Sequence, residues 1–478
     1  MDKFFKISER GSNVRAEIIG GLTTFFAMAY IITVNPNSVA GSAFDALDGS
    51  LKTIWLSVYV ASILVAVIGT LLMALYAKMP FAQACGMGLN SFFFVSFILP
   101  ELLSGGDPVK GYQEGLLIIL LSGVVFMLLS LTGARSYIAR ALPDNLKKAI
   151  PAGIGLFIAF IGFKNVGIIQ DNPYTFVQFF DFHGAITSAD GALAAWRIIA
   201  PVVLSLLGLF VMAVLAKKGV KGNIILTILG ISVVYYVTTW QAPSFDIQNI
   251  GDSFKAFGEV GLLGAFKGFS VFTPGEGESI ATVIISAVVL TITFTLVDMF
   301  DTIGTLYGTA SQADMLDENG DPQNLAQCMN SDSIATATGA LLGTSTCTTF
   351  VESAAGVGAG ARTGLASLVT AACFVLCLFL TPLAVIIPSC ATAPALIYVG
   401  VLMLKGFSKV DMDDIASAVP AFLALVMMPL TYSISNGIAI GAIAYVLIAL
   451  FTGKYTKKDI TITVIAILFA LRFIFVTM

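Results

Sequence analysis

The sequence predicts an all-α polytopic membrane protein, and three observations support this prediction. Of its 478 residues, 57% are apolar and only 11% are charged, whereas about 25% of residues are charged in a typical soluble protein. The mean hydropathy is +0.92. Apolar runs long enough to span a bilayer as helices, which takes about 20 residues, recur along the whole chain. The net charge of −4, without a basic patch that interleaves aromatic residues, gives no indication of a nucleic-acid partner.

The N-terminus is short and basic and leads directly into the first apolar segment. It carries Lys3, Lys6, Arg10 and Arg15 and does not have the pattern of a cleavable signal peptide. Because basic residues that flank a membrane span stay on the cytoplasmic side, we expect a cytoplasmic N-terminus.

Seven spans are predicted in the first half, with breaks where charged residues, glycines or prolines cluster. They cover residues 16–35, 53–77, 82–98, 115–132, 146–163, 198–216 and 223–240. The third segment is too short and too glycine-rich for one plain helix. We interpret it as an extended strand followed by a half-helix that begins near Gly88.

Seven further spans follow a polar connection at 241–278. They cover residues 279–303, 331–343, 345–359, 363–388, 412–431, 434–452 and 459–476. The third is again short and broken, and both third segments share the frame Cys-x4-(Asn or Glu)-Ser, starting at Cys85 and Cys347. A duplicated unit with an odd number of spans must be inverted in its second copy. The predicted fold therefore has fourteen transmembrane segments in a seven-plus-seven inverted repeat, and its paired broken segments indicate a transporter's binding site.

Basic residues in the short loops test this topology. Arg135, Arg140 and Lys147 fall in one predicted cytoplasmic loop, as the positive-inside rule requires. The basic cluster at Lys454–Lys458 disagrees, because the span count places it on the outer side. Either the spans near 396–431 are miscounted or the earlier loops fix the orientation, and we favour the second explanation.

Several motifs that suggest other chemistry are set aside. The glycines of 356–360 lack the βαβ unit of a dinucleotide site, and small residues for close helix packing explain them better. The acidic stretch 314–321 is out of register with a calcium loop. The six cysteines form no CxxC pair, so no metal site is predicted. The chain has no GxxxxGK[ST] phosphate loop, so an ATP-driven pump and a cofactor are not expected.

A few polar residues inside the predicted spans are the candidates for function. Glu352 lies in the hydroxyl-rich stretch 343–358, and an acid within a membrane segment indicates a functional site. Asp298 and Asp301 share one helix face, since they are three residues apart. Structural alternatives remain open: a helix–helix hydrogen bond for the two aspartates, and capping of its own half-helix for Asn90.

The motifs resemble the AzgA-like branch of the nucleobase–cation symporter-2 family. They are Phe5–Ser12, Arg15–Glu17, Gly21–Phe25, Gly86–Asn90, Phe300–Thr305 and Val351–Ala354. The resemblance implies a purine permease of the inner (plasma) membrane, usually a homodimer, with short strands in the third and tenth segments that meet at the substrate. It also implies a core domain and a gate domain. We place the core at 16–135 and 279–405, and the gate at 136–240 and 406–478.

The resemblance also assigns roles to residues. It implies that Asp301, Glu352 and Asn90 bind the purine, and we expect the binding set to include Ser353, Phe350 and Tyr30. The two aromatic residues are equally compatible with ordinary packing. Asp301, Glu352 and Asp298 are the expected proton-coupling groups, and neither a catalytic residue nor a metal ligand is predicted. Hypoxanthine and guanine are favoured over adenine.

Three other functions are weighed against proton-coupled purine transport. An intramembrane hydrolase could use two acids, but Asp298 and Asp301 on one helix are poorly placed to face each other across a cleft. An anion carrier of the same fold would present positive charge to its substrate, whereas this site presents carboxylates. Sodium coupling stays open, because the tenth span is rich in threonine and serine oxygens.

Overall fold

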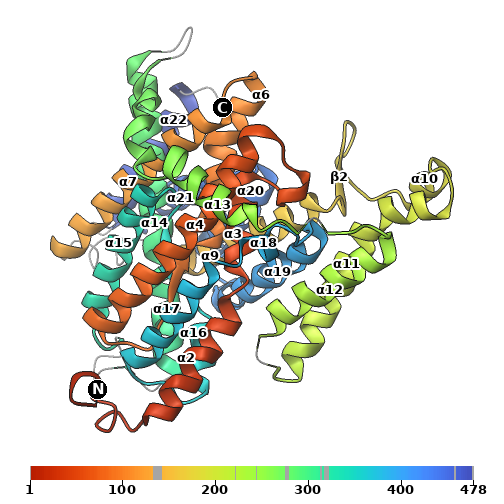
Figure 1. The fold of residues 1–478 in the computed structure, drawn as a ribbon. Coiled ribbons are helices and arrows are strands. Elements are labelled where there is room, and N and C mark those ends of the chain that lie inside the picture. The colour runs from red at the N-terminus through yellow and green to blue at the C-terminus, as the bar shows by residue number, and fades with distance from the viewer. Residues whose placement is uncertain are drawn as a thin grey trace.

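The computed structural model describes residues 2–132, 143–220, 222–243, 245–274, 279–312, 315–316, 322–456 and 459–475. Within these residues the chain is mostly helical (Figure 1). In the described ranges, eight helical segments are long and apolar enough to cross a membrane. The prediction of a helical, multi-pass membrane protein is therefore confirmed. Arg135, Arg140, Lys457, Lys458 and most of the calcium-like stretch lie outside the described residues.

The first half consists of helices with three short strands. Its helices are α1 (Asp2–Phe5), α2 (Val14–Met28), α3 (Ile31–Ala40), α4 (Gly49–Leu72), α5 (Met87–Phe93), α6 (Leu99–Ser104), α7 (Pro108–Thr132), α9 (Asp144–Asn165), α10 (Phe182–Thr187), α11 (Ala192–Lys217) and α12 (Asn223–Thr239). Its strands are β1 (Gln83–Cys85), β2 (Ile169–Asn172) and β3 (Phe176–Phe179). Short turns of 3-10 or π helix cover Phe44–Ala46, Met73–Ala77 and Phe94–Ile98.

The connection and the second half contain the remaining elements. The helices are α13 (Gln248–Ala256), α14 (Ile280–Gln312), α15 (Leu325–Leu342), α16 (Ser353–Gly358), α17 (Gly364–Cys377), α18 (Thr381–Ala384), α19 (Ser389–Met403), α20 (Ile415–Leu430), α21 (Ile434–Phe451) and α22 (Ile460–Phe475), and the strand is β4 (Cys347–Thr349). Turns of 3-10 or π helix cover Phe257–Gly261, Gly264–Phe272 and Leu404–Lys409.

Helix α19 lies where the sequence predicted no span, between residues 388 and 412. Pro394 within it interrupts the apolar pattern and leaves the carbonyl of Cys390 without its helical donor. The Ser205 hydroxyl of α11 donates to this carbonyl at 3.1 Å. A neighbouring helix therefore supplies the bond that proline removes, as membrane helices require. The span count in this region was wrong because the compensating partner lies far away in the sequence.

The helices form two groups according to their contacts. Helices α2–α5 and α7 pack with α14–α17 in the first group, whereas α9, α11 and α12 pack with α19–α21 in the second. Figure 1 shows α11 and α12 beside α19 at the edge of the molecule. Side chains of α11 and α12 such as Phe210 and Val237 are exposed, which suits a surface that faces lipid.

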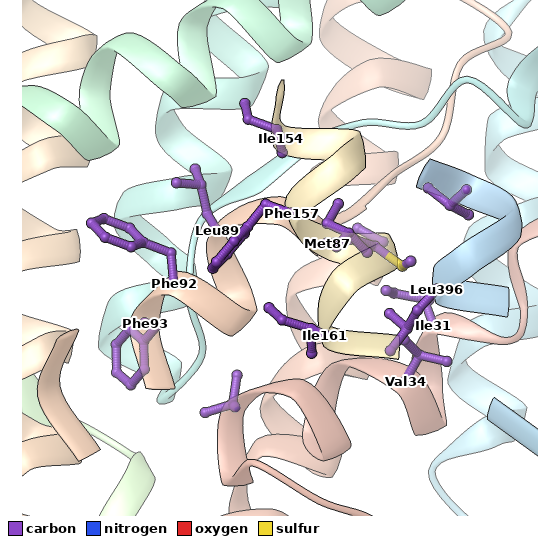
Figure 2. Packing of buried hydrophobic residues seen from close by; sticks show 14 of the residues in the cluster. Ile31, Val34, Met87, Leu89, Phe92, Phe93, Ile154, Phe157, Ile161 and Leu396 are labelled. Carbon is purple, nitrogen blue, oxygen red and sulfur yellow. The ribbon is translucent and has the colours of Figure 1, made fainter. Parts of the chain in front are cut away.

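The two groups meet where α5 packs against α9. Figure 2 shows Leu89 and Phe92 of α5 near Ile154 and Phe157 of α9, all of them buried. Gly88 permits this approach, since an added Cβ atom would lie 2.3 Å from Ile154 Cγ2. The half-helix predicted to begin near Gly88 therefore packs directly against α9.

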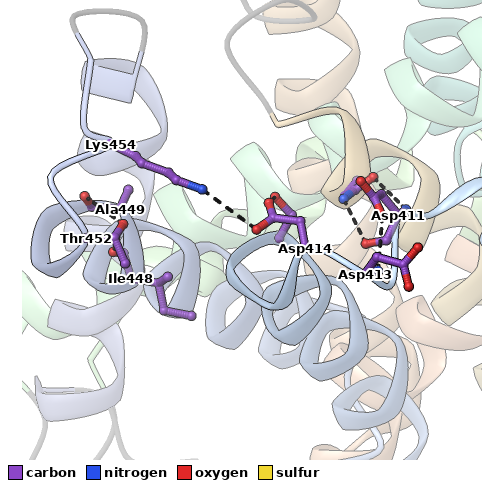
Figure 3. A network of polar contacts seen from close by, with 9 residues as sticks. Asp411, Asp413, Asp414, Ile448, Ala449, Thr452 and Lys454 are labelled. Carbon is purple, nitrogen blue, oxygen red and sulfur yellow. Dashed lines mark hydrogen bonds and ion pairs between the residues drawn. The ribbon is translucent and has the colours of Figure 1, made fainter.

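Lys454 lies at the end of the molecule where α9 begins. Its Nζ atom is 3.8 Å from Asp414 Oδ1 (Figure 3). The backbone of Asp411 in turn exchanges hydrogen bonds of 3.2 and 3.4 Å with the Asn145 side chain, one residue into α9. Lys454 thus shares one side with Lys147, in agreement with the positive-inside rule. The explanation favoured from the sequence was wrong, because the omitted helix α19 reverses the predicted side of Lys454.

Replacing Gly88 by alanine should destabilise the protein, because the new methyl group collides with Ile154. Overpacking of this kind costs about 1–3 kcal/mol. The Ile154→Ala change removes the colliding atom, so the double variant should be more stable than the sum of the two single effects. Thermal unfolding of the detergent-purified protein measures this. Strictly additive losses would contradict the close approach of α5 and α9.

Candidate functional site

Strands β1 and β4 place the polar candidates close together. They pair antiparallel, with Gln83 opposite Thr349 and Cys85 opposite Cys347. The Phe350 N–H donates to the carbonyl of Ala82 at 3.0 Å and extends the ladder. Because α5 begins directly after β1, and α16 soon after β4, residues far apart in the sequence meet at this small sheet.

Glu352 precedes the first turn of α16 and contacts Tyr30 from the junction of α2 and α3. The Tyr30 hydroxyl, which is buried, donates to Glu352 Oε1 at 2.6 Å. Within the described residues Glu352 forms no ion pair, and Tyr30 is the one side chain that donates a hydrogen bond to its carboxylate. A carboxylate has about four acceptor positions. Glu352 is therefore held in place on one side while most of its acceptor capacity stays available.

Asp301 lies on α14, half-buried and within electrostatic range of Glu352. Contacts between α14 and α16 bring the helices of these two acids side by side. Among the described residues, no basic side chain forms an ion pair with either carboxylate. The site therefore offers two acidic groups without a neutralising partner from the protein.

Asn90 is buried in α5 and bonds to the segment that leads into β4. Its Oδ1 atom accepts a hydrogen bond from the Ser345 hydroxyl. Its Nδ2 atom is buried and has no hydrogen-bond partner among the described residues. Asn90 does not cap its own half-helix, since Gly86 occupies that position. The capping alternative is therefore excluded, and an unused donor remains on the amide.

Ser353 and Phe350, two members of the expected binding set, form hydrogen bonds with the backbone of Ala82. The Ser353 hydroxyl accepts a hydrogen bond from the Ala82 N–H at 3.0 Å. Phe350 is 5% exposed at the end of β4. Both residues thus bind the backbone of Ala82, Ser353 through its hydroxyl and Phe350 through its own N–H, whereas Tyr30 contacts Glu352 directly.

Two acid–hydroxyl pairs join α14 and α15 behind the strands, in a crossed arrangement. The Thr302 hydroxyl of α14 donates to Asp332 Oδ2 of α15 at 2.5 Å. Thr336 Oγ1 of α15 is 2.8 Å from Asp298 Oδ2 of α14. Because each helix carries one aspartate and, one turn later, one threonine, the two helices bind each other reciprocally. The helix–helix hydrogen bond considered for Asp298 is therefore present.

Sequence reasoning missed Asp332 and Gln83. Asp332 is fully buried and accepts a hydrogen bond of 3.0 Å from Gln83 Nε2, which reaches it from β1. An acid inside an apolar span was the available signal, but the predicted span began at residue 331, so Asp332 resembled a flanking residue. Helix α15 begins at Leu325, which places Asp332 two turns inside it.

Comparison with known sequences identifies the family. The sequence model of the Xan_ur_permease family, a permease family, matches residues 15–440. The chain belongs to this family, the nucleobase–cation symporter-2 permeases. The guanine/hypoxanthine permease PbuG of Bacillus subtilis is 37% identical over 99% of this chain and all of its own length. The adenine permease AdeP of Escherichia coli is 34% identical over 100% of this chain and 96% of its own. The family transports solutes, so the chain is not an enzyme.

Solved structures share the fold. The transmembrane domain of the cyanobacterial bicarbonate transporter BicA matches with a TM-score of 0.58 and 15% identity, covering 89% of this chain and 97% of that one. The structure of SLC26A9 matches with a TM-score of 0.60 and 10% identity, covering 92% of this chain and 66% of that one. At these identities the likeness concerns the fold alone.

Replacing Gln83 by methionine should destabilise the protein, because buried Asp332 then loses a donor. Leaving a buried polar group without its partner costs about 1–3 kcal/mol, and more when the group is charged. Gln83 Nε2 also lies 3.4 Å from Thr349 Oγ1, so the matched control is Thr349→Val. Thermal unfolding should show a clear loss for the first variant and a small one for the second. Equal losses would mean that the Asp332 contact contributes little.

Proposed function

We propose that this permease imports purine nucleobases by proton symport. The observation that carries the proposal is the Glu352 carboxylate, which Tyr30 fixes through one oxygen and which has acceptor positions to spare. A purine edge presents neighbouring N–H donors, and a carboxylate accepts such pairs through short, charge-assisted hydrogen bonds. The names of the related permeases, which include guanine, hypoxanthine and adenine, support a purine as the ligand.

Asn90 supports hypoxanthine and guanine over adenine. Its buried Nδ2 donor has no protein partner. The 6-oxo group of hypoxanthine or guanine is an acceptor that would satisfy this donor, whereas the 6-amino group of adenine would set one donor against another. A buried donor left unpaired costs about 1–3 kcal/mol, which is enough to discriminate between the two classes of purine.

We further propose that a core domain moves against a gate domain, in an inverted repeat whose second half contains α19 in addition to the seven spans predicted from the sequence. The opposite directions of α4 and α15, the second spans of the two halves, support the inversion. Asn324, just before α15, donates to the carbonyl of Ala77 beyond the end of α4 at 3.0 Å. Helix α19 packs on α9 and α11, so we move the start of the second gate segment from residue 406 to Ser389.

We also propose a homodimer in the plasma membrane with a cytoplasmic N-terminus.

Uptake of radiolabelled hypoxanthine into cells that lack their own purine permeases tests the proposed substrate. Expression of the chain should give saturable uptake that excess guanine inhibits. The Glu352→Gln variant keeps the shape but replaces an acceptor with a donor, so uptake should fall at least about a hundredfold, as expected when two charged hydrogen bonds are lost. Membrane abundance is measured by immunoblot. Near-normal uptake by this variant would contradict the role of Glu352, and uptake of bicarbonate instead would favour an anion carrier.

The second functional prediction concerns Asp301, which we propose as the proton carrier, with Glu352 as the alternate. An imposed pH gradient should drive hypoxanthine accumulation in proteoliposomes that contain the wild-type protein. The Asp301→Asn variant has no proton to exchange at this position, so it should still exchange purine across the membrane but lose accumulation. Accumulation that follows a sodium gradient and survives the substitution would show that the proton mechanism is wrong.

A further inference from the structure

On the outer edge of each strand, the backbone of one residue is hydrogen-bonded by a threonine hydroxyl. Thr70 of α4 accepts from the N–H of Gln83 at 3.0 Å and donates to the carbonyl of the same residue at 3.1 Å. Thr336 of α15 accepts from the N–H of Cys347 at 3.0 Å, and its Oγ1 atom is also 3.0 Å from the Cys347 carbonyl. Both threonines are fully buried. Each therefore acts as a neighbouring strand would, for one residue.

Thr336 differs from Thr70 because an acid competes for its proton. Thr336 Oγ1 is 2.8 Å from Asp298 Oδ2 and 3.0 Å from the Cys347 carbonyl oxygen. A hydroxyl has one hydrogen and two acceptor positions. It can therefore donate to only one of these two oxygens. If it donates to the carbonyl, the short contact with Asp298 is a hydrogen bond only when Asp298 carries the proton and donates to Thr336.

The surroundings of Asp298 suit a neutral acid. Its Oδ1 atom is buried and has no hydrogen-bond partner in the part of the chain that the structure describes, and the residue is 1% exposed. Asp332 differs, since it accepts from Thr302 and from Gln83 through both of its oxygens. Burying a charge without compensating donors or a cation is unfavourable. Of the two acids in the crossed pairs, Asp298 is thus the one whose contacts fit a bound proton.

The other titratable groups around Asp298 are acids and thiols. Asp301 lies one turn further along α14, and Asp332 faces it from α15. The Cys347 thiol, on β4, is within electrostatic range of Asp298. In the described part of the chain, no lysine or arginine forms an ion pair with Asp298.

We infer that Asp298 is a proton switch that acts on strand β4 through Thr336. When Asp298 is protonated, its O–H donates to Thr336, and the Thr336 O–H donates to the carbonyl of Cys347. When the proton leaves Asp298, the Thr336 O–H turns to the carboxylate, and the Cys347 carbonyl loses its edge hydrogen bond. No covalent bond other than the O–H bond of Asp298 is broken, and one proton is released.

This switch connects protonation to the site, because β4 leads directly to Phe350 and Glu352. A loosened edge at Cys347 displaces the segment that carries the carboxylate. We therefore expect purine binding to weaken as pH rises through the range where Asp298 loses its proton. This consequence rests on the proposed function, whereas the proton on Asp298 and its contact with Thr336 do not.

Infrared difference spectroscopy of the purified, substrate-free protein tests the switch itself. Titration of the wild type with base should remove the C=O band of a protonated carboxylic acid, and Asp298→Asn should lack this band. Thr336→Val should shift the frequency of the band, because the acid loses its acceptor, whereas Thr70→Val should leave it unchanged. A band that persists in Asp298→Asn and shows no change on titration in any variant would overturn the inference.

Purine affinity as a function of pH tests the consequence. The wild-type affinity for hypoxanthine should fall with rising pH by up to about tenfold per pH unit, the limit for one linked proton. The Asp298→Asn side chain keeps an N–H donor toward Thr336 but has no proton to lose in this pH range. The part of the slope that Asp298 contributes should therefore disappear. Thr336→Ser keeps the hydroxyl and should retain the slope, whereas Thr336→Val should lose it. Thr70→Val is the matched control, since it opens the edge of β1 without touching an acid and should leave the slope unchanged.

The two experiments separate the possible failures. A wild-type protein that binds no purine but shows the Asp298-dependent infrared band would refute the proposed function and leave the proton switch intact. A protein that binds hypoxanthine with the same slope in Asp298→Asn as in the wild type would refute the switch and leave the proposed function intact.

Discussion

The structure depends on the pairing of two very short strands that come from opposite halves of the chain. Extended backbone within a membrane protein must find partners for its N–H and C=O groups, because lipid offers none. β1 and β4 satisfy each other on one side, and the hydroxyls of Thr70 and Thr336 satisfy Gln83 and Cys347 on the other. Every candidate site residue is held by this small sheet or by a helix that contacts it. The polar site is therefore a by-product of the need to satisfy a broken helix.

The same requirement explains why so many small hydroxylated residues surround the strands. Thr302, Thr336 and Thr348 are buried, and each carries a donor and two acceptor positions in little volume. Thr302 Oγ1 is 2.7 Å from Thr348 Oγ1, so the chain of hydroxyls runs from Asp332 on α15 to β4. Such networks specify a unique arrangement when every member is satisfied. Among the described residues around the strands, buried atoms without a partner remain on Asp298 and Asn90, which the sequence had already indicated, and also on Gln83 and Thr346.

Much of the fold could be predicted from the sequence because its causes are local. Apolar runs give the spans, and the broken segments at Gln83–Cys85 and Cys347–Thr349 follow from glycine and threonine content. Helix α19 was not predicted, because Pro394 leaves the Cys390 carbonyl without a helical donor and only the tertiary structure brings the Ser205 hydroxyl to it. Sequence motifs identified Glu352, Asp301 and Asn90 as candidate site residues. The role of Thr336 could not be predicted, because it depends on its contacts with Asp298 and Cys347, which only the structure shows. Ser353 and Phe350 illustrate the converse, since a motif position does not reveal whether a side chain contacts a ligand or the backbone.

Because the sheet joins residue 83 to residue 349, the first half of the chain cannot complete it during synthesis. At the usual rates of translation, β1 waits on the order of ten to fifty seconds before β4 has been made. Throughout that time the edge of β1 that later pairs with β4 has no backbone partner, and Asn90 lacks Ser345. The nascent first half must therefore shelter this segment at the insertion machinery or among its own helices. Thr70 lies within the first half, so its hydrogen bonds with Gln83 on the other edge of β1 can form before β4 has been made.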